Sequence, residues 1–242
     1  MVTGGSQGIG RAIALAFAEA GANVAVSSRK LPSLEKVAEE IKTIGRKSLP
    51  IASHVAKIED SKNLVERVKA EFGTIDILVN VAGANPAAVP ILDAEEWLWD
   101  IIMNVNLKGL FFLSQLVARI MKEQGGGSII NMSSIEGVRP QVESKLGVYS
   151  VSKAGVIMLT RVMAQEWGQY NIRVNAIAPG VVKTHFSEIF WKGPHAEELA
   201  KRHALGRFAE PEDIVGAALY LASDASSYMT GEVLVLAGGD LG

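Results

Sequence analysis

Short apolar segments alternate with longer amphipathic segments along the whole chain, and this alternation restricts the fold more than any other feature. The short segments are rich in valine and isoleucine, as buried strands are. In the longer segments, apolar residues recur with the period of a helix. Strands that alternate with helices form a parallel sheet covered by helices on both faces, so we expect an α/β fold. The expected strands are residues 23–28, 75–80, 128–132, 173–178 and 232–236, and the expected helices are residues 9–20, 34–44, 59–72, 95–121, 151–167 and 211–222.

No linker, repeat or low-complexity stretch divides the 242 residues, so we expect one domain over 1–242. Only Met1, Val2 and Thr3 precede the first glycine, which leaves a first strand at the lower limit of strand length. Either the start is truncated or upstream residues lie outside this numbering.

The segment TGGSQGIG, from Thr3 to Gly10, joins that short strand to an alanine-rich helix. Glycines in such a place let the backbone turn tightly and approach a pyrophosphate, which rests on the helix amino terminus. The alternative is a tight turn that binds nothing. The loop residues expected to contact a cofactor are Gly4, Ser6, Gln7, Gly8, Ile9 and Gly10.

The end of the second strand indicates which nucleotide is bound. An acidic residue there would bind a ribose 2′-hydroxyl, and none occurs between Asn23 and Lys30. Arg29 instead offers a planar guanidinium suited to a phosphate, with Ser28 and Lys30 as helpers. The sequence therefore favours NADP(H) over NAD(H). The alternative is that these cations are simply solvated.

Tyr149 and Lys153 lie four residues apart in YSVSK, a spacing that places both on one face of a helix. A nearby ammonium lowers the pKa of a phenol from its usual value of about 10. A tyrosine tuned in this way exchanges a proton with an alcohol or carbonyl oxygen. The alternative is an ordinary surface pair.

Taken together, these motifs resemble those of the short-chain dehydrogenase/reductase family, and the resemblance runs nearly end to end. The motifs occur in the family's order: TGGSQGIG, NVAG at 80–83, Asn106 in MNVNLKG, NMSS at 131–134, YSVSK, and PGVVKT at 179–184. The resemblance implies a Rossmann-type, doubly wound parallel sheet of about seven strands in the order 3-2-1-4-5-6-7.

The resemblance also implies catalytic roles for four residues. Tyr149 would be the general acid–base, and Lys153 would lower its pKa and hold the nicotinamide ribose. Ser134 would hydrogen-bond the substrate oxygen; Ser133 is a poorer candidate because neighbouring strand residues face opposite ways. Asn106 would bend its helix and hold a water in a proton relay to Lys153.

Further residues would bind the cofactor by the same resemblance. Those expected on the adenosine side are His54, Val55, Asn80, Ala82 and Gly83, and those expected at the nicotinamide carboxamide are Pro179, Gly180, Val182 and Thr184. The chain departs from the family pattern in three places. Val81 replaces a polar residue, His54 replaces an aspartate near adenine, and residues 138–147 form a slightly longer stretch that we expect to modify the pocket wall. A neutral loop histidine remains the alternative for His54.

Composition excludes several classes of function. The chain has no cysteine, so thiolate metal sites and cysteine nucleophiles are excluded, and a reducing, cytoplasmic setting fits. A formal net charge of −2 gives no case for nucleic acid or an anionic membrane. No apolar stretch reaches the length of a membrane span, and no signal peptide is expected.

His185, His195 and His203 have no paired acids at metal spacing, so we expect no metal site.

Residues 185–208 are expected to form a lid over the substrate. Phe186, Ile189, Phe190 and Trp191 indicate an apolar pocket for a hydrophobic ketone or aldehyde, unless they only pack the loop or an interface.

Two helical segments, 105–121 and 151–163, are apolar around most of their circumference, which indicates burial against a partner. The family resemblance implies that these two helices form a dimer interface and that two dimers pair into a tetramer, so we expect a homodimer or homotetramer.

The leading hypothesis is an oxidoreductase that transfers a hydride between NADP(H) and a carbonyl or secondary alcohol. A 3-oxoacyl thioester is one candidate substrate, and a free ketone, a sugar or a steroid is another. A catalytically silent nucleotide-binding regulator and a purely structural oligomer are the alternatives from other classes.

Overall fold

The computed structural model describes residues 1–240 and contains one seven-stranded parallel sheet. The strands lie in the order β3-β2-β1-β4-β5-β6-β7, which confirms the predicted fold class. The strands are β1 (Val2–Thr3), β2 (Val24–Ser28), β3 (Ser48–Ala52), β4 (Ile77–Asn80), β5 (Gly127–Met132), β6 (Ile172–Pro179) and β7 (Val233–Leu236).

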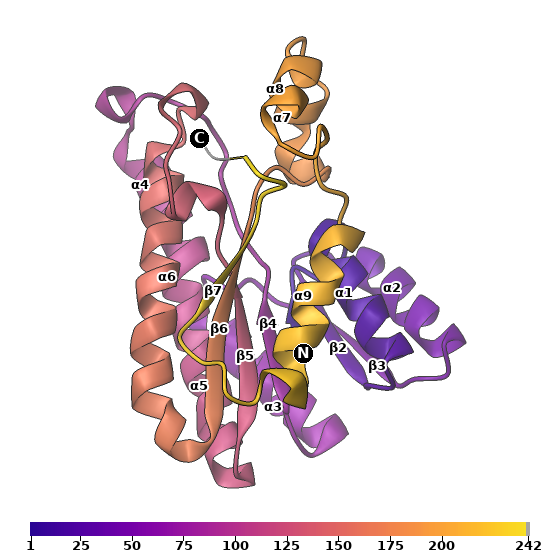
Figure 1. Cartoon of the computed structure of the whole chain (residues 1–242). Coiled ribbons are helices and arrows are strands. Elements are labelled where there is room, and N and C mark those ends of the chain that lie inside the picture. The colour runs from indigo at the N-terminus through magenta and orange to yellow at the C-terminus, as the bar shows by residue number, and fades with distance from the viewer. Residues whose placement is uncertain (241–242) are drawn as a thin grey trace.

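Helices cover both faces of the sheet (Figure 1). One face carries α1 (Gly8–Glu19), α2 (Leu31–Thr43) and α9 (Glu212–Ala222). The other carries α3 (Ile58–Phe72), α5 (Leu110–Gln124) and α6 (Gly147–Trp167). The remaining helices are α4 (Glu96–Met103), α7 (Glu188–Trp191) and α8 (Ala196–Arg202).

The alternation of side chains along each strand divides the core into two layers. Val79 of β4 and Ile130 of β5 pack with the helices on the first face, while their neighbours Leu78 and Ile129 pack with those on the second. All four side chains are fully buried. Because strands buried on both faces have no polar side, they appear in the sequence as continuous apolar runs.

The short first strand is present as the sequence predicts, whereas one strand, β3, was not predicted. β1 has only two residues yet lies in the middle of the sheet, paired with β2 and β4. β3 is not among the segments that the pattern predicts, because Ser48 and Pro50 interrupt its apolar run. Proline is tolerated there because β3 is the edge strand, where one side of the backbone needs no partner.

The predicted helix over 95–121 is continuous from Glu96 to Gln124, with a π-helical turn at Asn104–Gly109. This 29-residue helix is long and apolar enough to cross a membrane by length and composition, contrary to the expectation that no stretch is. A helix in the core of a soluble protein has the same length and composition. Leu113, Val117 and Met121 of this helix pack against the sheet.

Candidate active site

A cavity of about 1140 Å³ lies at the carboxyl ends of the strands, where the loops after β1, β2, β4, β5 and β6 meet. It brings together Ser134 and nearly all residues that the sequence predicts for cofactor binding. The predicted cofactor-binding residues that line it are Gly4, Ser6, Gln7, Gly8, Ile9, Gly10, Ser28, Arg29, Lys30, His54, Val55, Ala82, Gly83, Tyr149, Lys153, Pro179, Gly180, Val182 and Thr184. Asn80 and Asn106 do not line it.

The glycine-rich loop forms a cradle that side chains would fill. Gly4 and Gly8 have positive φ angles of 65° and 53°, which L side chains rarely adopt. A Cβ on Gly10 would lie 2.3 Å from the carbonyl oxygen of Gly4. The loop has no side chains at these glycines and leads into the amino terminus of α1. The first backbone N–H groups of a helix have no partner within it, so they favour binding of an anion there. This geometry fits a dinucleotide pyrophosphate.

Three buried hydroxyls lie where β2 and β3 end. The Oγ atoms of Ser27, Ser28 and Ser53 have no hydrogen-bond partner among the described residues, and all three residues line the cavity. Arg29 and Lys30 line the same end, are exposed, and form no ion pair within residues 1–240. A buried hydroxyl without a partner costs free energy, so this set fits a ligand that carries several acceptors. A phosphorylated ribose is such a group.

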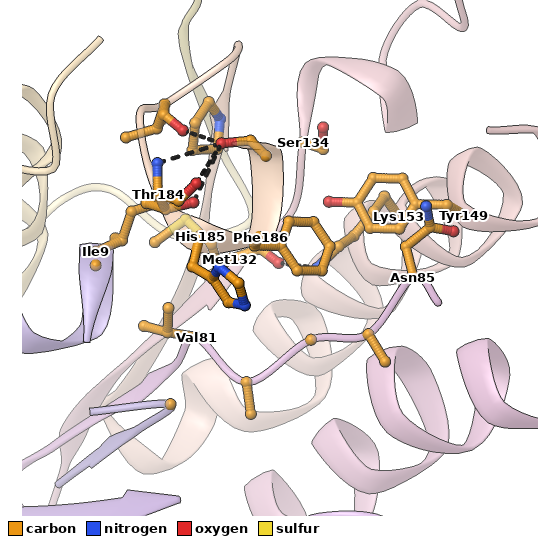
Figure 2. Close-up of a pocket in the computed structure, with 18 of the residues that line it drawn as sticks. Ile9, Val81, Asn85, Met132, Ser134, Tyr149, Lys153, Thr184, His185 and Phe186 are labelled. Atoms are coloured by element: carbon orange, nitrogen blue, oxygen red, sulfur yellow. Dashed lines mark hydrogen bonds between the residues drawn. The ribbon is translucent and has the colours of Figure 1, made fainter. Parts of the chain in front are cut away.

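Ser134 and Tyr149 come from different elements and meet in the cavity (Figure 2). Ser134 lies two residues after the end of β5, and Tyr149 lies in the first turn of α6, which begins earlier than the predicted residue 151. Both residues are 9% exposed, and the Ser134 hydroxyl is close enough to the Tyr149 phenol to lower its pKa. The Nζ of Lys153, one turn further along α6, lies 5.5 Å from the centroid of the Tyr149 ring.

The pKa of Tyr149 differs from the sequence expectation. Burial raises it to about 12, while the hydrogen bond with Ser134 acts in the opposite direction and the charge of Glu136 raises it further. The expected lowering of this pKa by Lys153 is therefore wrong for this structure. Burial also lowers the pKa of Lys153 to about 8, because its ammonium has lost its water. That ammonium donates to the carbonyl oxygen of Met132 at 2.8 Å.

Asn106 lies within the π-helical turn at Asn104–Gly109 and is 1% exposed. Its Oδ1 accepts from the N–H of Ala84 at 2.7 Å, and its Nδ2 donates to the Ala84 carbonyl at 3.0 Å and to Ser152 Oγ at 3.0 Å. Ser152 in turn donates to the main-chain oxygen of Tyr149 at 2.7 Å. Asn106 thus joins the loop after β4 to the turn of α6 that carries Tyr149.

Asn80 occupies a different place from the one expected. It is 4% exposed, and its Nδ2 lies 2.9 Å from both Ser114 Oγ and Asn131 Oδ1, to which it donates. Asn131 continues this chain by donating to Thr160 at 3.0 Å. The side chain of Asn80 therefore fastens β4, β5 and the helices behind them, and lies behind the cavity rather than in it.

The histidines have carboxylate neighbours that the sequence analysis does not foresee. His185 lies 3.1 Å from Glu188, His195 lies 3.4 Å from Glu198, and His203 lies 3.8 Å from Asp240. Within residues 1–240, no three histidine, aspartate or glutamate side chains gather as a metal-ligand group. His54 uses its ring Nδ1 to accept from the N–H of Ala56 at 3.2 Å.

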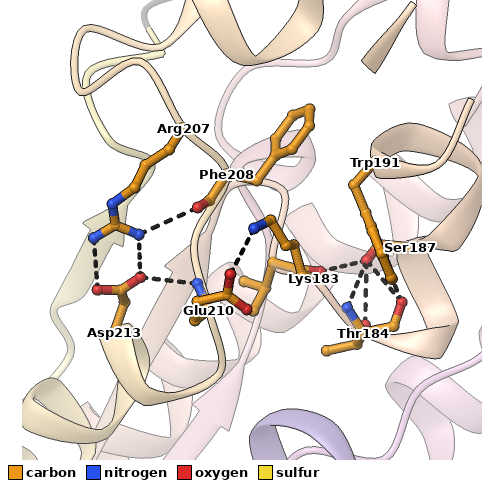
Figure 3. A network of polar contacts seen from close by, with 9 residues as sticks. Lys183, Thr184, Ser187, Trp191, Arg207, Phe208, Glu210 and Asp213 are labelled. Atoms are coloured by element: carbon orange, nitrogen blue, oxygen red, sulfur yellow. Dashed lines mark hydrogen bonds and ion pairs between the residues drawn. The ribbon is translucent and has the colours of Figure 1, made fainter. Parts of the chain in front are cut away.

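Residues 185–208 stand above the carboxyl ends of the strands, with α7 and α8 projecting from the sheet (Figure 1). Polar contacts fasten the base of this segment (Figure 3). Lys183 pairs with Glu210 at 2.6 Å, and Trp191 Nε1 donates to the Thr184 carbonyl at 3.0 Å. At the end of the segment, Arg207 pairs with Asp213 at 2.5 Å.

The lid segment and the stretch 138–147 both contribute to the cavity beside Tyr149. From the second of these, Gln141, Glu143, Ser144 and Leu146 line it. The ring of Phe186 lies 6.0 Å from the Tyr149 ring between centroids and is half-exposed (Figure 2). The other wall contains residues that the sequence analysis does not single out: Glu136, Gln141, Glu143, Arg202 and Asp240. An acid two positions after Ser134, in an otherwise apolar stretch, is the signal that could have identified Glu136. Asp240 gives no such signal.

The chain is similar in sequence to known proteins along nearly its whole length. Residues 4–240 match the family model described as enoyl-(acyl carrier protein) reductase. The chain is 39% identical to dehydrogenase/reductase SDR family member 4 of Caenorhabditis elegans, with 99% of this chain and 93% of that protein covered. It is 41% identical to 3-oxoacyl-[acyl-carrier-protein] reductase FabG of Thermotoga maritima, with 99% and 96% covered.

Solved structures of similar proteins have the same fold as this chain. A short-chain type dehydrogenase/reductase from Mycobacterium marinum superposes with a TM-score of 0.94 at 38% identity, with 99% of this chain and 94% of that chain covered. A protein from Beutenbergia cavernae described as a putative NAD(P)-dependent gluconate 5-dehydrogenase, with NADP bound at low occupancy, gives a TM-score of 0.92 at 36% identity, with 99% of this chain and 95% of that chain covered. A 7α-hydroxysteroid dehydrogenase in complex with NADH gives 0.93 at 34%, with 98% and 92% covered. The chain therefore belongs to the short-chain dehydrogenase/reductase family of oxidoreductases, which use a nicotinamide cofactor.

Proposed function

We propose that the protein transfers a hydride between NADP(H) and a carbonyl or secondary alcohol, with Tyr149 as the general acid–base. The observation that carries this proposal is the meeting of Ser134, Tyr149 and Lys153 in one cavity with the glycine-rich loop. A phenol, a hydroxyl and an ammonium beside a dinucleotide cradle are the groups that carbonyl reduction needs.

The preference for NADP(H) rests on the end of β2. Arg29 and Lys30 offer two cations there, and the hydroxyls of Ser27 and Ser28 lack partners within the described residues. The acidic residues that line the cavity within residues 1–240 are Glu136, Glu143 and Asp240. None of these follows β2, so no carboxylate at that end opposes a 2′-phosphate.

Bound NADPH would supply the hydride. Ser134 and Tyr149 would then both direct a hydroxyl at the substrate carbonyl oxygen, and these two hydrogen bonds stabilise the charge that develops on it. Because its pKa is raised to about 12, Tyr149 is protonated at neutral pH. It is therefore in the form that donates a proton when a carbonyl is reduced.

Lys153 and Asn106 support Tyr149 in this scheme. The ammonium of Lys153 would favour the tyrosinate that forms when the proton leaves. Asn106 positions the chain around Tyr149 through Ser152 and Ala84. It would also hold the water through which Lys153 recovers a proton.

Two substrate candidates have separate support. The 41% identity to a 3-oxoacyl thioester reductase favours an acyl thioester. The cavity wall that contains Phe186, Phe190 and Phe208 is apolar and suits a free ketone equally. A catalytically silent regulator is disfavoured because the four residues expected to act in catalysis are all present.

We further propose a homodimer or homotetramer in the cytoplasm. Val151, Met158 and Val162 lie along α6 with exposed fractions of 44%, 58% and 42%. A contiguous apolar face of this kind is typical of a surface that a second copy covers. The absence of cysteine fits a reducing compartment.

A carbonyl panel assayed with both cofactors tests the proposal. The panel should contain a 3-oxoacyl thioester, alkyl ketones, hydroxy ketones and a keto steroid, with NADPH or NADH oxidation followed at 340 nm, the usual absorbance of the reduced ring. We expect turnover of at least one ketone class and a higher kcat/KM with NADPH. Cofactor binding without turnover of any carbonyl would support the silent regulator instead.

A further inference from the structure

We propose that Glu136 is a positioning residue for the reaction, which joins the turn that carries Ser134 to the turn of α6 that carries Tyr149. This inference rests on the proposed function and deepens it, because it names the residue that sets how the two hydroxyls meet the substrate oxygen. Glu136 lies two residues beyond the NMSS motif.

Glu136 reaches Ser134 through its backbone. Ser134 caps a short helical turn at Ile135–Gly137, and its Oγ accepts from the N–H of Glu136 at 3.2 Å. A hydroxyl has one proton and two lone pairs, so this contact occupies a lone pair and leaves the proton to be donated elsewhere. The peptide N–H of Glu136 therefore turns the Ser134 proton away from the backbone of the turn.

The side chain of Glu136 holds this peptide against two other segments. It is 7% exposed, and its Oε2 accepts from Ser150 Oγ at 2.8 Å and from the N–H of Gln141 at 3.3 Å. Ser150 is the neighbour of Tyr149 in α6, and Gln141 belongs to the cavity wall. One carboxylate oxygen thus fastens the turn after β5, the first turn of α6 and the wall to one another.

This contact complements one that lies further along α6. A Cβ on Gly137 would lie 2.5 Å from the carbonyl carbon of Lys153, so the turn after β5 also packs on α6 one helical turn beyond Tyr149. Two contacts at different levels of α6 fix the direction of the turn as well as its position. Without the bond from Ser150 to Glu136, the turn is no longer held at the level of Tyr149 itself.

Glu136 also brings a negative charge close to the Tyr149 phenol. Its two hydrogen-bond donors are neutral, and it forms no ion pair within residues 1–240, so no cation offsets this charge. Burial is the main cause of the raised pKa of Tyr149, and the charge of Glu136 raises that pKa further. Lys153 faces Tyr149 from the same helix, with its ammonium 5.5 Å from the ring centroid, and the lid faces it with the apolar ring of Phe186.

The titratable side chains farther along this wall are paired with one another. Arg202 pairs with Glu143 at 2.9 Å, and His203 lies 3.8 Å from Asp240. The wall carboxylate whose charge acts on the phenol is therefore that of Glu136.

Three variants separate the hydrogen bonds of Glu136 from its charge. Both donors reach the same oxygen, so the single amide oxygen of Glu136→Gln can accept both bonds while the charge is removed. Glu136→Ala removes the bonds and the charge. Ser150→Ala removes the bond to α6 and keeps the charge.

Single-turnover reduction by the NADPH-loaded enzyme measures the positioning. The substrate is the ketone that the wild-type enzyme reduces fastest in the carbonyl panel. At pH 7, Glu136→Ala and Ser150→Ala should each be slower by about tenfold or more, because small misplacements of reacting groups cost rate steeply. Glu136→Gln should stay within about threefold of wild type, since it keeps the contacts.

The pH profile of the same step measures the charge. Reduction requires protonated Tyr149, so the rate falls as the pH rises through the pKa of that tyrosine. Removal of a nearby negative charge lowers this pKa, so the fall in Glu136→Gln should occur at least about half a pH unit below that in wild type. Ser150→Ala should show no such shift. A pH jump in the stopped-flow mixer gives access to the alkaline range before the protein unfolds.

The control is Glu123→Gln, which removes an exposed carboxylate on α5 that pairs with Lys69. It should leave both the rate and the pH profile unchanged. Tm values and NADPH-binding titrations establish that each variant is folded.

The outcomes separate this inference from the proposed function. Wild-type rates in Glu136→Ala, or an unshifted pH profile in Glu136→Gln, would overturn the role of Glu136 and leave the proposed function standing. If Glu136→Ala does not fold, Ser150→Ala and Glu136→Gln decide the question. If the wild-type enzyme binds NADPH and reduces no ketone, the proposed function fails and this inference fails with it.

Discussion

Ser133 holds Lys153 against the end of β5 by donating its hydroxyl to the Lys153 main-chain oxygen at 2.9 Å. The ammonium of the same lysine donates to the adjacent Met132 carbonyl at 2.8 Å. Lys153 is thus fastened to one strand end through both its backbone and its side chain. A Cβ on Gly137 would lie 2.5 Å from the Lys153 carbonyl carbon, so the turn after Ser134 packs directly on α6. These contacts determine where Ser134 lies relative to Tyr149.

The buried ammonium of Lys153 predicts how stability depends on pH. Its pKa is lowered from 10.5 to about 8, so between these values the unfolded chain binds more protons than the folded one. The free energy of unfolding therefore rises with pH across this window by about 3 kcal/mol, and this gain is lost again as the pH falls from 10.5 to about 8. Urea unfolding at pH 7.5 and 9.5 should show the cofactor-free wild type gaining about 2 kcal/mol relative to Lys153→Met. An unchanged difference between the two proteins would contradict the buried, desolvated ammonium.

The close approach of Gly10 to Gly4 predicts a loss of cofactor binding in Gly10→Ala. A Cβ there would lie 2.3 Å from the Gly4 carbonyl oxygen, so the loop must move away from the dinucleotide. We expect NADPH affinity to fall at least about tenfold, measured by fluorescence titration. Gly216→Ala is the matched control, because Gly216 lies exposed on α9 with open space around it. That substitution should leave affinity unchanged and raise stability by about 0.5–1 kcal/mol.

The position of Arg29 at the end of β2 leads us to predict a preference for NADPH over NADH. Charge-assisted hydrogen bonds are worth about 1.5–3 kcal/mol each, so Arg29→Ala should raise the KM for NADPH about 10- to 100-fold and change the KM for NADH far less. Steady-state kinetics with both cofactors measure the two effects. Arg67→Ala, an exposed arginine on α3, controls for the loss of a positive charge. Equal increases for both cofactors in Arg29→Ala would argue against phosphate recognition.

Much of the fold could be predicted because its strands are buried on both faces. Segments such as Ile129–Ile130 are apolar without a break, and each is followed by a helical pattern. β3 was missed for a physical reason, since an edge strand tolerates Pro50 and shows no such run. The π-helical turn at Asn104–Gly109 also leaves no simple trace in the sequence, because it changes the helix by a single residue.

The candidate site could be predicted where it depends on local motifs and not where it depends on packing. The glycine loop and YSVSK are local, and both line the cavity. The placement of Asn80 depends on its partners Ser114 and Asn131, which lie 34 and 51 residues away in the chain. The pKa of Tyr149 likewise depends on burial, which spacing alone does not reveal.

The role of Tyr149 is the central claim, and Tyr149→Phe tests it most directly. The variant keeps the ring against Phe186 and removes only the hydroxyl that meets Ser134. Single-turnover reduction of a ketone by the NADPH-loaded variant should be slower by roughly 10²–10⁴, with NADPH affinity and Tm close to wild type. Tyr228→Phe, which removes a hydroxyl from a fully exposed ring, should reduce at the wild-type rate. A near-normal rate in Tyr149→Phe would contradict the account.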